Sequence, residues 1–299
     1  MGSHIKTTIG LCVKNAEVTI RDAIESVMSQ DFPHELIELI VVDGYSKDRT
    51  VSILRDYLDK SDIKIRILFE NEGLGRARQL VVDNTRGDYV VWVDSDMVLP
   101  RDFVREQVRF MEQNPSVGIG KGKYTARKED SIVATLENTE FLLNFNREGE
   151  TNSRSLGTSG CIYRIEAVRQ ARGFDETIKG VGEDMDIEYR IKHCGWKLSV
   201  TPAAFYEKRR QNWKSLWNEY FWHGYGWHSI LRKNIDLVNL NKLLPPVAII
   251  AESIRVPAAY RLTHRKVVLL LPLHYVFKRT AWLLGLLSSS LNYRTPKRN

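Results

Sequence analysis

The stretch "DYVVWVDSDMVLP", residues 88–100, joins four consecutive apolar residues, Val90 to Val93, to two carboxylates that stand one residue apart. Apolar residues on both faces of a strand indicate a sheet that is covered on both sides. In open α/β sheets, ligands bind outside the carboxyl ends of the strands. Asp94 and Asp96 therefore stand where such a sheet would bind its ligand.

Strands and amphipathic helices alternate at short spacing before this stretch. We predict strands at "IGLCV" (9–13), "LIELIVVDG" (36–44) and "IKIRILFE" (63–70), followed by helices at 20–28, 46–58 and 75–85, respectively. This alternation predicts an α/β fold with a Rossmann-like, mostly parallel, doubly wound sheet. Further along the chain, we expect helices at 102–113, at 166–171 and from about Glu183, and strands at 117–126 and 196–202.

The net charge of +7 is concentrated near the C-terminus of the 299-residue chain. Residues 256–299 contain eight Lys or Arg and no Asp or Glu, which leaves the remainder nearly neutral. A basic segment indicates an anionic partner, and its interleaving with "VVLLLPLHYVF" and "AWLLGLLSSSL" favours lipid over nucleic acid. The three cysteines are far apart, so we expect neither a disulfide framework nor a zinc site. Residues 1–4 resemble an expression scar, and we expect a cytosol-facing protein without a cleaved leader.

Several polar clusters are candidate site residues, and each also has a purely structural reading. The acids of the D-x-D at 94–96 suit a hard divalent cation, although two acids can also open a surface turn. Asp43 follows a buried strand, where it can accept from a nucleotide or form an Asx turn. Glu183 and Asp184 can cap a helix or take a proton from an acceptor hydroxyl. The glycines of "GTSGC", residues 157–161, permit either a turn or close approach to a ligand.

These elements follow the order seen in family 2 glycosyltransferases with the GT-A fold, which the chain resembles over roughly residues 5–205. The resemblance is carried by five segments: "GLCVKNAEVTIRDAIESV", "VVDGYSKDRT", "NEGLGRARQLVVDNTRGDYVVWVDSDMVLP", "GTSGCIYRIEAVRQARGFDE" and "GVGEDMDIEYRIKHCGWKL". It implies a metal-dependent, inverting glycosyltransferase.

The resemblance also implies roles for individual residues. Asp184 would be the general base beside Glu183, and Asp96 with Asp94 would hold Mn²⁺ or Mg²⁺ on the donor diphosphate. The residues implied to bind the nucleotide sugar are Val13, Asn15, Asp43, Arg78, Asp94, Gly157, Gly160, Arg209, Arg210 and Trp213.

Two motifs depart from the family pattern. The first motif, "CVKNAEV", keeps only Asn15 and Glu17, which leaves the nucleotide open. The Q-x-x-R-W motif of cellulose and hyaluronan synthases is "RRQNW" here, which retains Trp213 but has Arg209 and Asn212 at the polar positions. Because the few apolar segments cannot form a polymer channel, we do not expect a processive polymerase.

The composition becomes aromatic and basic beyond Glu207. Residues 213–232 carry an aromatic and leucine stripe at helical spacing, which suits either a core helix or a helix in the membrane interface. Residues 267–291 are long enough to span a bilayer, but Lys278 and Arg279 lie mid-segment, so two helices lying flat remain the alternative. We therefore predict a catalytic domain at 1–207, an interface helix at 208–235 and membrane-associated helices at 236–299.

The predicted function is transfer of a hexose from a nucleotide sugar to a polyprenyl-phosphate or lipid-linked glycan acceptor, with a cytoplasmic catalytic domain at the membrane. The chain resembles dolichyl-phosphate mannose synthases and a shortened cellulose-synthase-like enzyme, which suggests mannose from GDP-mannose in lipid-linked oligosaccharide assembly. The alternatives are a UDP-hexose-dependent glucosyltransferase, a nucleotidyltransferase on a similar sheet, and a noncatalytic membrane adaptor. We expect no nucleic-acid partner.

Overall fold

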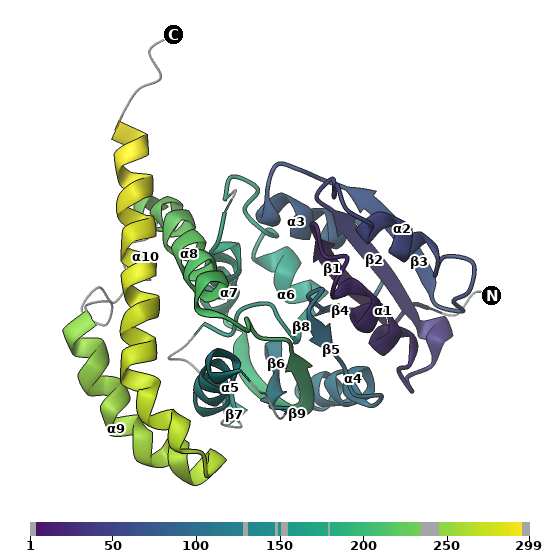
Figure 1. Cartoon of the computed structure of the whole chain (residues 1–299). Coiled ribbons are helices and arrows are strands. Elements are labelled where there is room, and N and C mark those ends of the chain that lie inside the picture. Colours follow the sequence, from purple (N-terminus) through teal and green to yellow (C-terminus); the bar gives the residue numbers. More distant parts are fainter. Residues whose placement is uncertain are drawn as a thin grey trace. The chain divides into compact units, whose positions relative to one another are not determined.

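The computed structural model describes residues 4–127, 131–146, 149–150, 155–178, 180–233 and 245–294. The chain forms two compact units, which are described separately (Figure 1). The sheet unit comprises Met1–Thr125, Phe145–Lys179 and Glu183–Lys208, and the helical unit comprises Ala126–Asn144, Gly180–Gly182 and Arg209–Asn299. Residues 236–244 of the predicted membrane segment, and the basic residues Lys297 and Arg298, lie outside the described residues.

Four parallel strands form the first half of the sheet, in the order β3-β2-β1-β4. They are β1 (Thr7–Val13), β2 (Ile37–Asp43), β3 (Lys64–Phe69) and β4 (Tyr89–Trp92). The connecting helices are α1 (Ile20–Met28), α2 (Thr50–Arg55) and α3 (Leu74–Asn84), and a 3-10 turn, η1 (His34–Leu36), precedes β2. All seven residues of β2 are buried, as its apolar sequence predicts.

The second half of the sheet is mixed, in the order β4-β8-β6-β9-β5, with β7 paired to β9. Only the β6–β9 pair is parallel there, so the expected parallel character holds for the first half alone. The strands are β5 (Met97–Val98), β6 (Val117–Thr125), β7 (Gly149–Glu150), β8 (Cys161–Arg164) and β9 (Lys197–Glu207). The helices are α4 (Phe103–Gln113), α6 (Ile165–Gln170) and α7 (Glu183–His193).

Helices cover both faces of this sheet. The helices α3, α6 and α7 share one buried core with the strands, and α1 and α4 lie on the other face (Figure 1). Trp92 lies at the centre of the shared core, with its ring edge-on to Tyr163 and to Phe174 at centroid distances of 6.2 and 5.5 Å. Two covered faces explain why β4 carries apolar residues without alternation, and this arrangement confirms the predicted fold class.

The helical unit contains α5 (Ile132–Phe145), whose last residue is assigned to the sheet unit, and three long C-terminal helices. These are α8 (Trp213–Lys233), α9 (Pro245–Thr263) and α10 (Leu271–Arg294), with the 3-10 segment η4 (Lys266–Leu270) before α10. Glycines bring α8 and α10 together, because a Cβ on Gly224 would lie 1.8 Å from the Trp282 carbonyl oxygen and one on Gly285 would lie 2.0 Å from that of Phe221. The sequence analysis did not identify α5.

Lys278, which lies mid-way along α10, is buried among charged partners. Its Nζ donates to Glu137 Oε1 at 2.6 Å, to Glu140 Oε2, and to the Tyr220 hydroxyl at 3.0 Å. Residues 266–291 are, among the described residues, the one helical segment long and apolar enough to cross a bilayer, and a third of the tested window is buried. One face of α10 is therefore packed against protein through ion pairs.

Candidate active site

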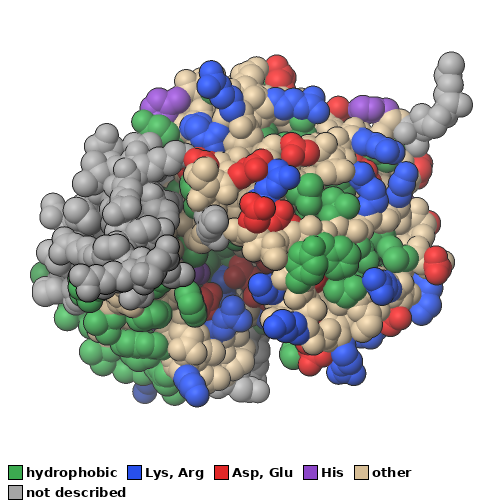
Figure 2. Space-filling model, turned by 90° about the horizontal axis from the view of Figure 1, so that it is seen from above, with side chains coloured by type: hydrophobic (Ala, Val, Ile, Leu, Met, Phe, Trp, Pro, Cys, Tyr) green, Lys and Arg blue, Asp and Glu red, His purple; other side chains and the backbone are tan. Residues whose placement is uncertain are grey.

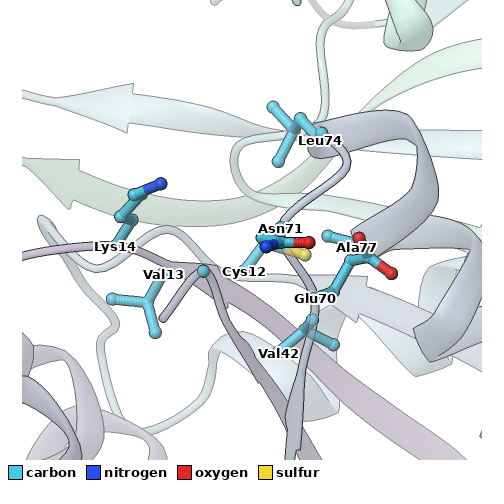
Figure 3. Close-up of a pocket in the computed structure, with 10 residues that line it drawn as sticks. Cys12, Val13, Lys14, Val42, Glu70, Asn71, Leu74 and Ala77 are labelled. Atoms are coloured by element: carbon cyan, nitrogen blue, oxygen red, sulfur yellow. The ribbon is translucent and has the colours of Figure 1, made fainter. Parts of the chain in front are cut away.

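A cavity of about 250 Å³ opens in the sheet unit at the carboxyl ends of β1, β2 and β3. Figure 3 shows Lys14 on one side of the opening and Glu70 on the other. The lining comprises Cys12, Val13, Lys14, Val42, Gly44, Glu70, Asn71, Gly73, Leu74 and Ala77. This is the edge at which the sequence places a nucleotide, and of the predicted binding residues Val13 lines it.

The loops after β1 and β2 are tied together beside this cavity. Asn15 has a positive φ of 50°, its backbone N–H donates to Ser46 Oγ at 2.8 Å, and its Oδ1 accepts from the Lys47 backbone N–H at 2.9 Å. The Asp43 carboxylate is fully buried and accepts from both the backbone N–H and the hydroxyl of Ser46. The structure thus shows the Asx-turn arrangement at Asp43, and Asn15 links two loops.

The segment Ser155–Cys161 runs beside three acids, two of which it bonds. The Leu156 backbone N–H donates to Glu188 at 2.9 Å, a Cβ on Gly157 would lie 3.6 Å from Asp184 Oδ2, and the Ser159 hydroxyl donates to Asp94. These acids come from the turn after β4 and from α7, which are distant in sequence. The fold therefore brings Asp94 and Asp184 beside one loop.

The two predicted glycines of this loop differ in their surroundings. Gly160 has a φ of +64°, and a Cβ there would lie 2.3 Å from Phe205 Cε1. Its carbonyl oxygen also accepts from the Gln107 side chain at 2.9 Å. Gly157 has a φ of +67°, and Asp184 Oδ2 is the one atom of the described residues within 4 Å of its Cβ position. Gly160 is therefore required by packing, whereas a side chain at Gly157 would point toward the predicted base.

Glu183 and Asp184 are adjacent in sequence but lie in different environments. Glu183 is 1% exposed and forms an ion pair with Arg78 from α3, while its Oε2 has no hydrogen-bond partner among the described residues. The Arg78 guanidinium lies 5.8 Å from the centroid of the Trp92 ring. Asp184 is partly exposed, and its Oδ1 accepts from the Met185 backbone N–H at 2.8 Å. Asp184 is thus the member of the pair that an acceptor can reach.

Burial and the clustered acids alter the protonation of neighbouring groups. Burial, with the charge of Asp184 adding to it, raises the pKa of Glu188 to about 8. Burial raises the pKa of Cys12, in the cavity, to about 12, an effect that Arg78 opposes and Asp94 reinforces. The Cys12 thiol is therefore neutral near pH 7, and Arg78 and Asp94 lie close enough to the cavity to influence its ionisation.

The D-x-D after β4 suits a divalent cation. Asp94 and Asp96 are both partly exposed, and the Lys208 backbone N–H donates to the Asp96 carbonyl oxygen at 2.9 Å, which holds the turn. Two carboxylates together with the oxygens of a diphosphate are a donor set that Mg²⁺ or Mn²⁺ accepts. These two residues would hold the metal.

A second group of possible metal ligands lies in the helical unit, where oxygen and nitrogen atoms of Glu137, Glu140 and His274 are within 4.8 Å of one another. The Lys278 ammonium group already bonds both carboxylates, and His274 Nε2 lies 3.2 Å from Glu137. Because a cationic side chain neutralises these acids, the group does not fit a metal.

The remaining predicted residues belong to the helical unit. The Arg209 guanidinium is buried, lies 3.7 Å from the Phe141 ring centroid and donates to Asn138 Oδ1. Arg210 donates to Glu219 at 2.8 Å. Trp213 is 41% exposed, with its ring 5.1 Å from that of Phe277. Within this unit, all three therefore have protein partners.

Sequence reasoning missed several residues of the site. Cys12, Lys14, Glu70 and Asn71 line the cavity, and Ser159 holds Asp94. Asn71 stands in the quoted segment "NEGLGRARQ", directly after the third strand, and its place at a strand end was the available signal. The sequence carries no comparable signal for Glu188, because its raised pKa depends on burial.

Comparison with known proteins agrees with this geometry. The chain is 31% identical over 217 residues to poly(ribitol-phosphate) β-N-acetylglucosaminyltransferase TarS of Staphylococcus aureus, covering 66% of this chain and 38% of TarS. It is 28% identical over 206 residues to an N-acetylglucosaminyltransferase of a Rhizobium species, covering 64% and 46%. The chain thus spans less than half the length of each of these two relatives.

Solved structures share the fold. The mannosyltransferase PcManGT of Pyrobaculum calidifontis, in complex with GDP-Man and Mn²⁺, aligns with a TM-score of 0.64 at 18% identity, over 96% of this chain and 87% of that one. Residues 1–349 of S. aureus TarS in complex with UDP align with a TM-score of 0.54 at 19% identity, over 97% and 91%.

The family profile of glycosyl transferase family 2 matches residues 8–171, which carry the cavity, the D-x-D and the loop before β8. With this match and the GT-A-like sheet, the chain belongs to the family 2 glycosyltransferases.

Proposed function

We propose that this protein is an inverting glycosyltransferase that moves a sugar from a nucleotide-sugar donor to a lipid-linked acceptor at a membrane surface. The observation that carries the proposal is the segment 155–161, in which Ser159 donates to Asp94 and the open side of Gly157 faces Asp184. In this arrangement Asp184 would be the base, beside the carboxylates that would bind the metal on the donor diphosphate. Inversion follows if the acceptor oxygen attacks opposite the leaving diphosphate.

Different residues of the sheet unit would perform different parts of the reaction. The cavity beside Lys14 and Asn71 would hold the nucleotide, and Asp94 and Asp96 would hold Mn²⁺ or Mg²⁺, which stabilises charge on the leaving diphosphate when bound. Asp184 Oδ2, beside Gly157, would accept the proton of the acceptor hydroxyl. The buried Arg78–Glu183 ion pair would position the first turn of α7, and with it Asp184.

UDP-N-acetylglucosamine is the first donor to test, because the relatives at 28–31% identity are N-acetylglucosaminyltransferases. GDP-mannose, the donor suggested by the resemblance to dolichyl-phosphate mannose synthases, is the second candidate. Other UDP-hexoses follow.

The helical unit supports the membrane part of the proposal. Leu273, Leu284, Leu287 and Leu291 of α10 are 46–66% exposed and are spaced by 11, 3 and 4 residues, which keeps them on one helical face. Figure 2 shows hydrophobic side chains gathered on this unit. Exposed apolar surface on such a scale marks a membrane or protein interaction site, and the basic C-terminal segment favours anionic lipid.

Donor turnover by the purified full-length protein in detergent tests the proposal. Release of UDP or GDP is measured with Mn²⁺ or Mg²⁺ for each donor, with and without a polyprenyl-phosphate acceptor. We expect release from one donor, a loss of about 100-fold or more in Asp96→Ala, and a similar loss of acceptor-stimulated release in Asp184→Asn.

The matched control is Asp59→Asn, an exposed carboxylate before β3, at the opposite end of that strand from the cavity. It should retain wild-type turnover. Nucleotide binding without turnover of any donor would favour a noncatalytic adaptor, and pyrophosphate release would favour a nucleotidyltransferase.

A further inference from the structure

The helical unit contains a cavity of about 480 Å³ beside α5 and the end of α9, which we call the α5–α9 pocket. Its volume falls within the range of small-molecule sites, roughly 300 to 1,000 Å³. The pocket is lined by Ala126, Arg127, Thr135, Asn138, Thr139, Leu142, Leu262, Thr263 and Arg265. All of these residues belong to the helical unit, so the pocket is formed within one compact part of the chain.

Asn138 provides a buried hydrogen-bond donor in the lining. The residue is 6% exposed, and its Nδ2 has no hydrogen-bond partner among the described residues. Its Oδ1 accepts from Arg209 Nε at 3.3 Å, which orients the amide and commits Nδ2 to the donor role. A buried N–H without an acceptor costs free energy. A ligand oxygen that accepted a hydrogen bond from Nδ2 would remove that cost.

The charged lining residues are both cationic. Arg127 and Arg265 are exposed, and Arg265 is held at the pocket by a 2.9 Å hydrogen bond to Thr135 Oγ1. Among the described residues, the lining includes no Asp or Glu. The nearby acids of α5, Glu137 and Glu140, bond to Lys278. Two guanidinium groups and an amide donor are the groups that recognise a phosphate.

The rest of the lining consists of three threonines, Ala126 and two leucines. Leu142 and Leu262 line it, and Leu262 is half exposed. Leu269 and Leu270 follow in η4 with 62% and 39% exposure, so the pocket lies close in sequence to exposed apolar side chains. Groups that donate hydrogen bonds to a phosphate, placed beside leucine side chains, suit a ligand in which a phosphate is attached to an aliphatic chain.

We propose that the α5–α9 pocket binds the phosphate headgroup of a membrane lipid, with the first part of the aliphatic chain against Leu142 and Leu262. The inference rests on the membrane part of the proposed function and does not depend on the donor. The helical unit would then carry a lipid-binding site in addition to its exposed apolar surface.

Three probes separate the contributions of charge and chain: farnesyl phosphate carries both, farnesol only the chain, and inorganic phosphate only the charge. Binding to the full-length protein is measured by isothermal titration calorimetry in detergent, without nucleotide sugar. We expect farnesyl phosphate to bind at least about tenfold more tightly than either of the other probes.

Asn138→Asp is the sharpest variant, because it keeps the oxygen that accepts from Arg209, removes the donor and adds a negative charge. We expect it and Arg265→Gln each to weaken farnesyl phosphate binding about tenfold or more. The matched control is Arg261→Gln, which changes an exposed arginine of α9 outside the lining and should bind as wild type. Circular dichroism and thermal unfolding establish that the variants are folded.

Equal affinity for farnesol and farnesyl phosphate, or unchanged binding by folded Asn138→Asp, would overturn the proposal. Equal affinity for inorganic phosphate would assign the pocket to a free anion instead and would also overturn it. The donor-turnover assay is independent of these outcomes. A protein that turns over donor but fails this test loses the lipid site alone, and one that binds lipid without turnover loses the enzymatic proposal alone.

Discussion

At the scale of single residues, Glu183 and Asp184 show how position separates two neighbouring carboxylates. The ion pair with Arg78 holds Glu183 inside the sheet unit, whereas Asp184 lies beside Gly157 and is partly exposed. A buried acid with a fixed cationic partner is suited to positioning, and an accessible acid is suited to proton transfer. This contrast explains why two acids occur together where a helix cap needs one.

Glu188 gives a pH-dependent prediction. Its pKa is raised from 4.5 to about 8 in the folded protein, so the folded state holds a proton that the unfolded chain has already released in this window. The free energy of unfolding should therefore fall as pH rises from about 4.5 to 8. Glu188→Gln removes this titration and retains an oxygen for the Leu156 N–H.

We expect Glu188→Gln to raise the free energy of unfolding by several kcal/mol, up to about 4–5 kcal/mol, at pH 8.5 and by less than about 1 kcal/mol at pH 5. Urea denaturation at both pH values checks this. Glu72→Gln, at an exposed position, serves as the control and should change neither value. An equal gain at both pH values would mean that packing, not titration, is responsible.

The position of the acids could be predicted from sequence, but their partners could not. Asp94 and Asp96 follow a run of apolar residues, and this local signal identifies the end of a buried strand. The bonds from Ser159 to Asp94 and from Arg78 to Glu183 join residues 65 and 105 positions apart. No local pattern encodes such distances, so these roles became visible only in the structure.

At the scale of elements, α5 and α10 are joined by buried charges. Lys278 is 1% exposed and bonds Glu137 and Glu140. Removing one partner of a buried pair leaves an uncompensated charge, which typically costs about 3–5 kcal/mol. We therefore expect Lys278→Met to destabilise the helical unit by about this amount, measured by chemical denaturation followed by tryptophan fluorescence.

Two further variants separate charge from packing. Lys266→Met, at an exposed lysine, should leave stability within about 0.5 kcal/mol of wild type. Adding Glu137→Gln and Glu140→Gln to Lys278→Met should recover part of the loss, because no unpaired charge would remain. If the triple variant were less stable than the single one, the argument from unpaired charge would fail.

The same ion pairs explain why α5 escaped sequence analysis. Its sequence, "IVATLENTEFLLNF", places Glu137, Asn138 and Glu140 among the apolar residues, and all three are buried. Periodicity assumes that buried residues are apolar. Here Lys278 and Arg209 supply the compensation from far along the chain, so the apolar stripe is interrupted.

At the scale of the whole molecule, membrane association predicts an effect of two surface leucines. Leu273 and Leu287 are 66% and 56% exposed, so their replacement with Gln should not unfold the protein. If α10 lies in the bilayer interface, each substitution removes about 1.5 kcal/mol of apolar transfer. We expect the double variant to lose about tenfold or more in binding to anionic vesicles, measured by co-sedimentation.

Val18→Gln is the control, because Val18 is 87% exposed on the sheet unit. It should sediment with vesicles as wild type does. Unchanged vesicle binding by the leucine variant would rule out this face of α10 as the membrane contact.

Much of the chain's architecture could be predicted from its alternating strands and helices, since each apolar run carries its own local signal. The division of the chain into two units could not be predicted, because residues 126–144 belong to the same unit as helices that begin some 70 residues later. The order of the strands in the second half of the sheet could not be predicted either. There, β8 lies between β4 and β6 in antiparallel pairing, which no single segment encodes.

The commitment of one face of α10 to Lys278 and its partners has a kinetic consequence. If α10 contacts the membrane as proposed, its polar, protein-packed side would let it enter one leaflet and leave it again, unlike a helix surrounded by lipid. Catalysis would then depend on the adsorption equilibrium and on the two-dimensional density of acceptor, not on its bulk concentration. Diluting the acceptor with inert phospholipid would slow the reaction even at a constant total amount, and the cell could regulate it through bilayer composition.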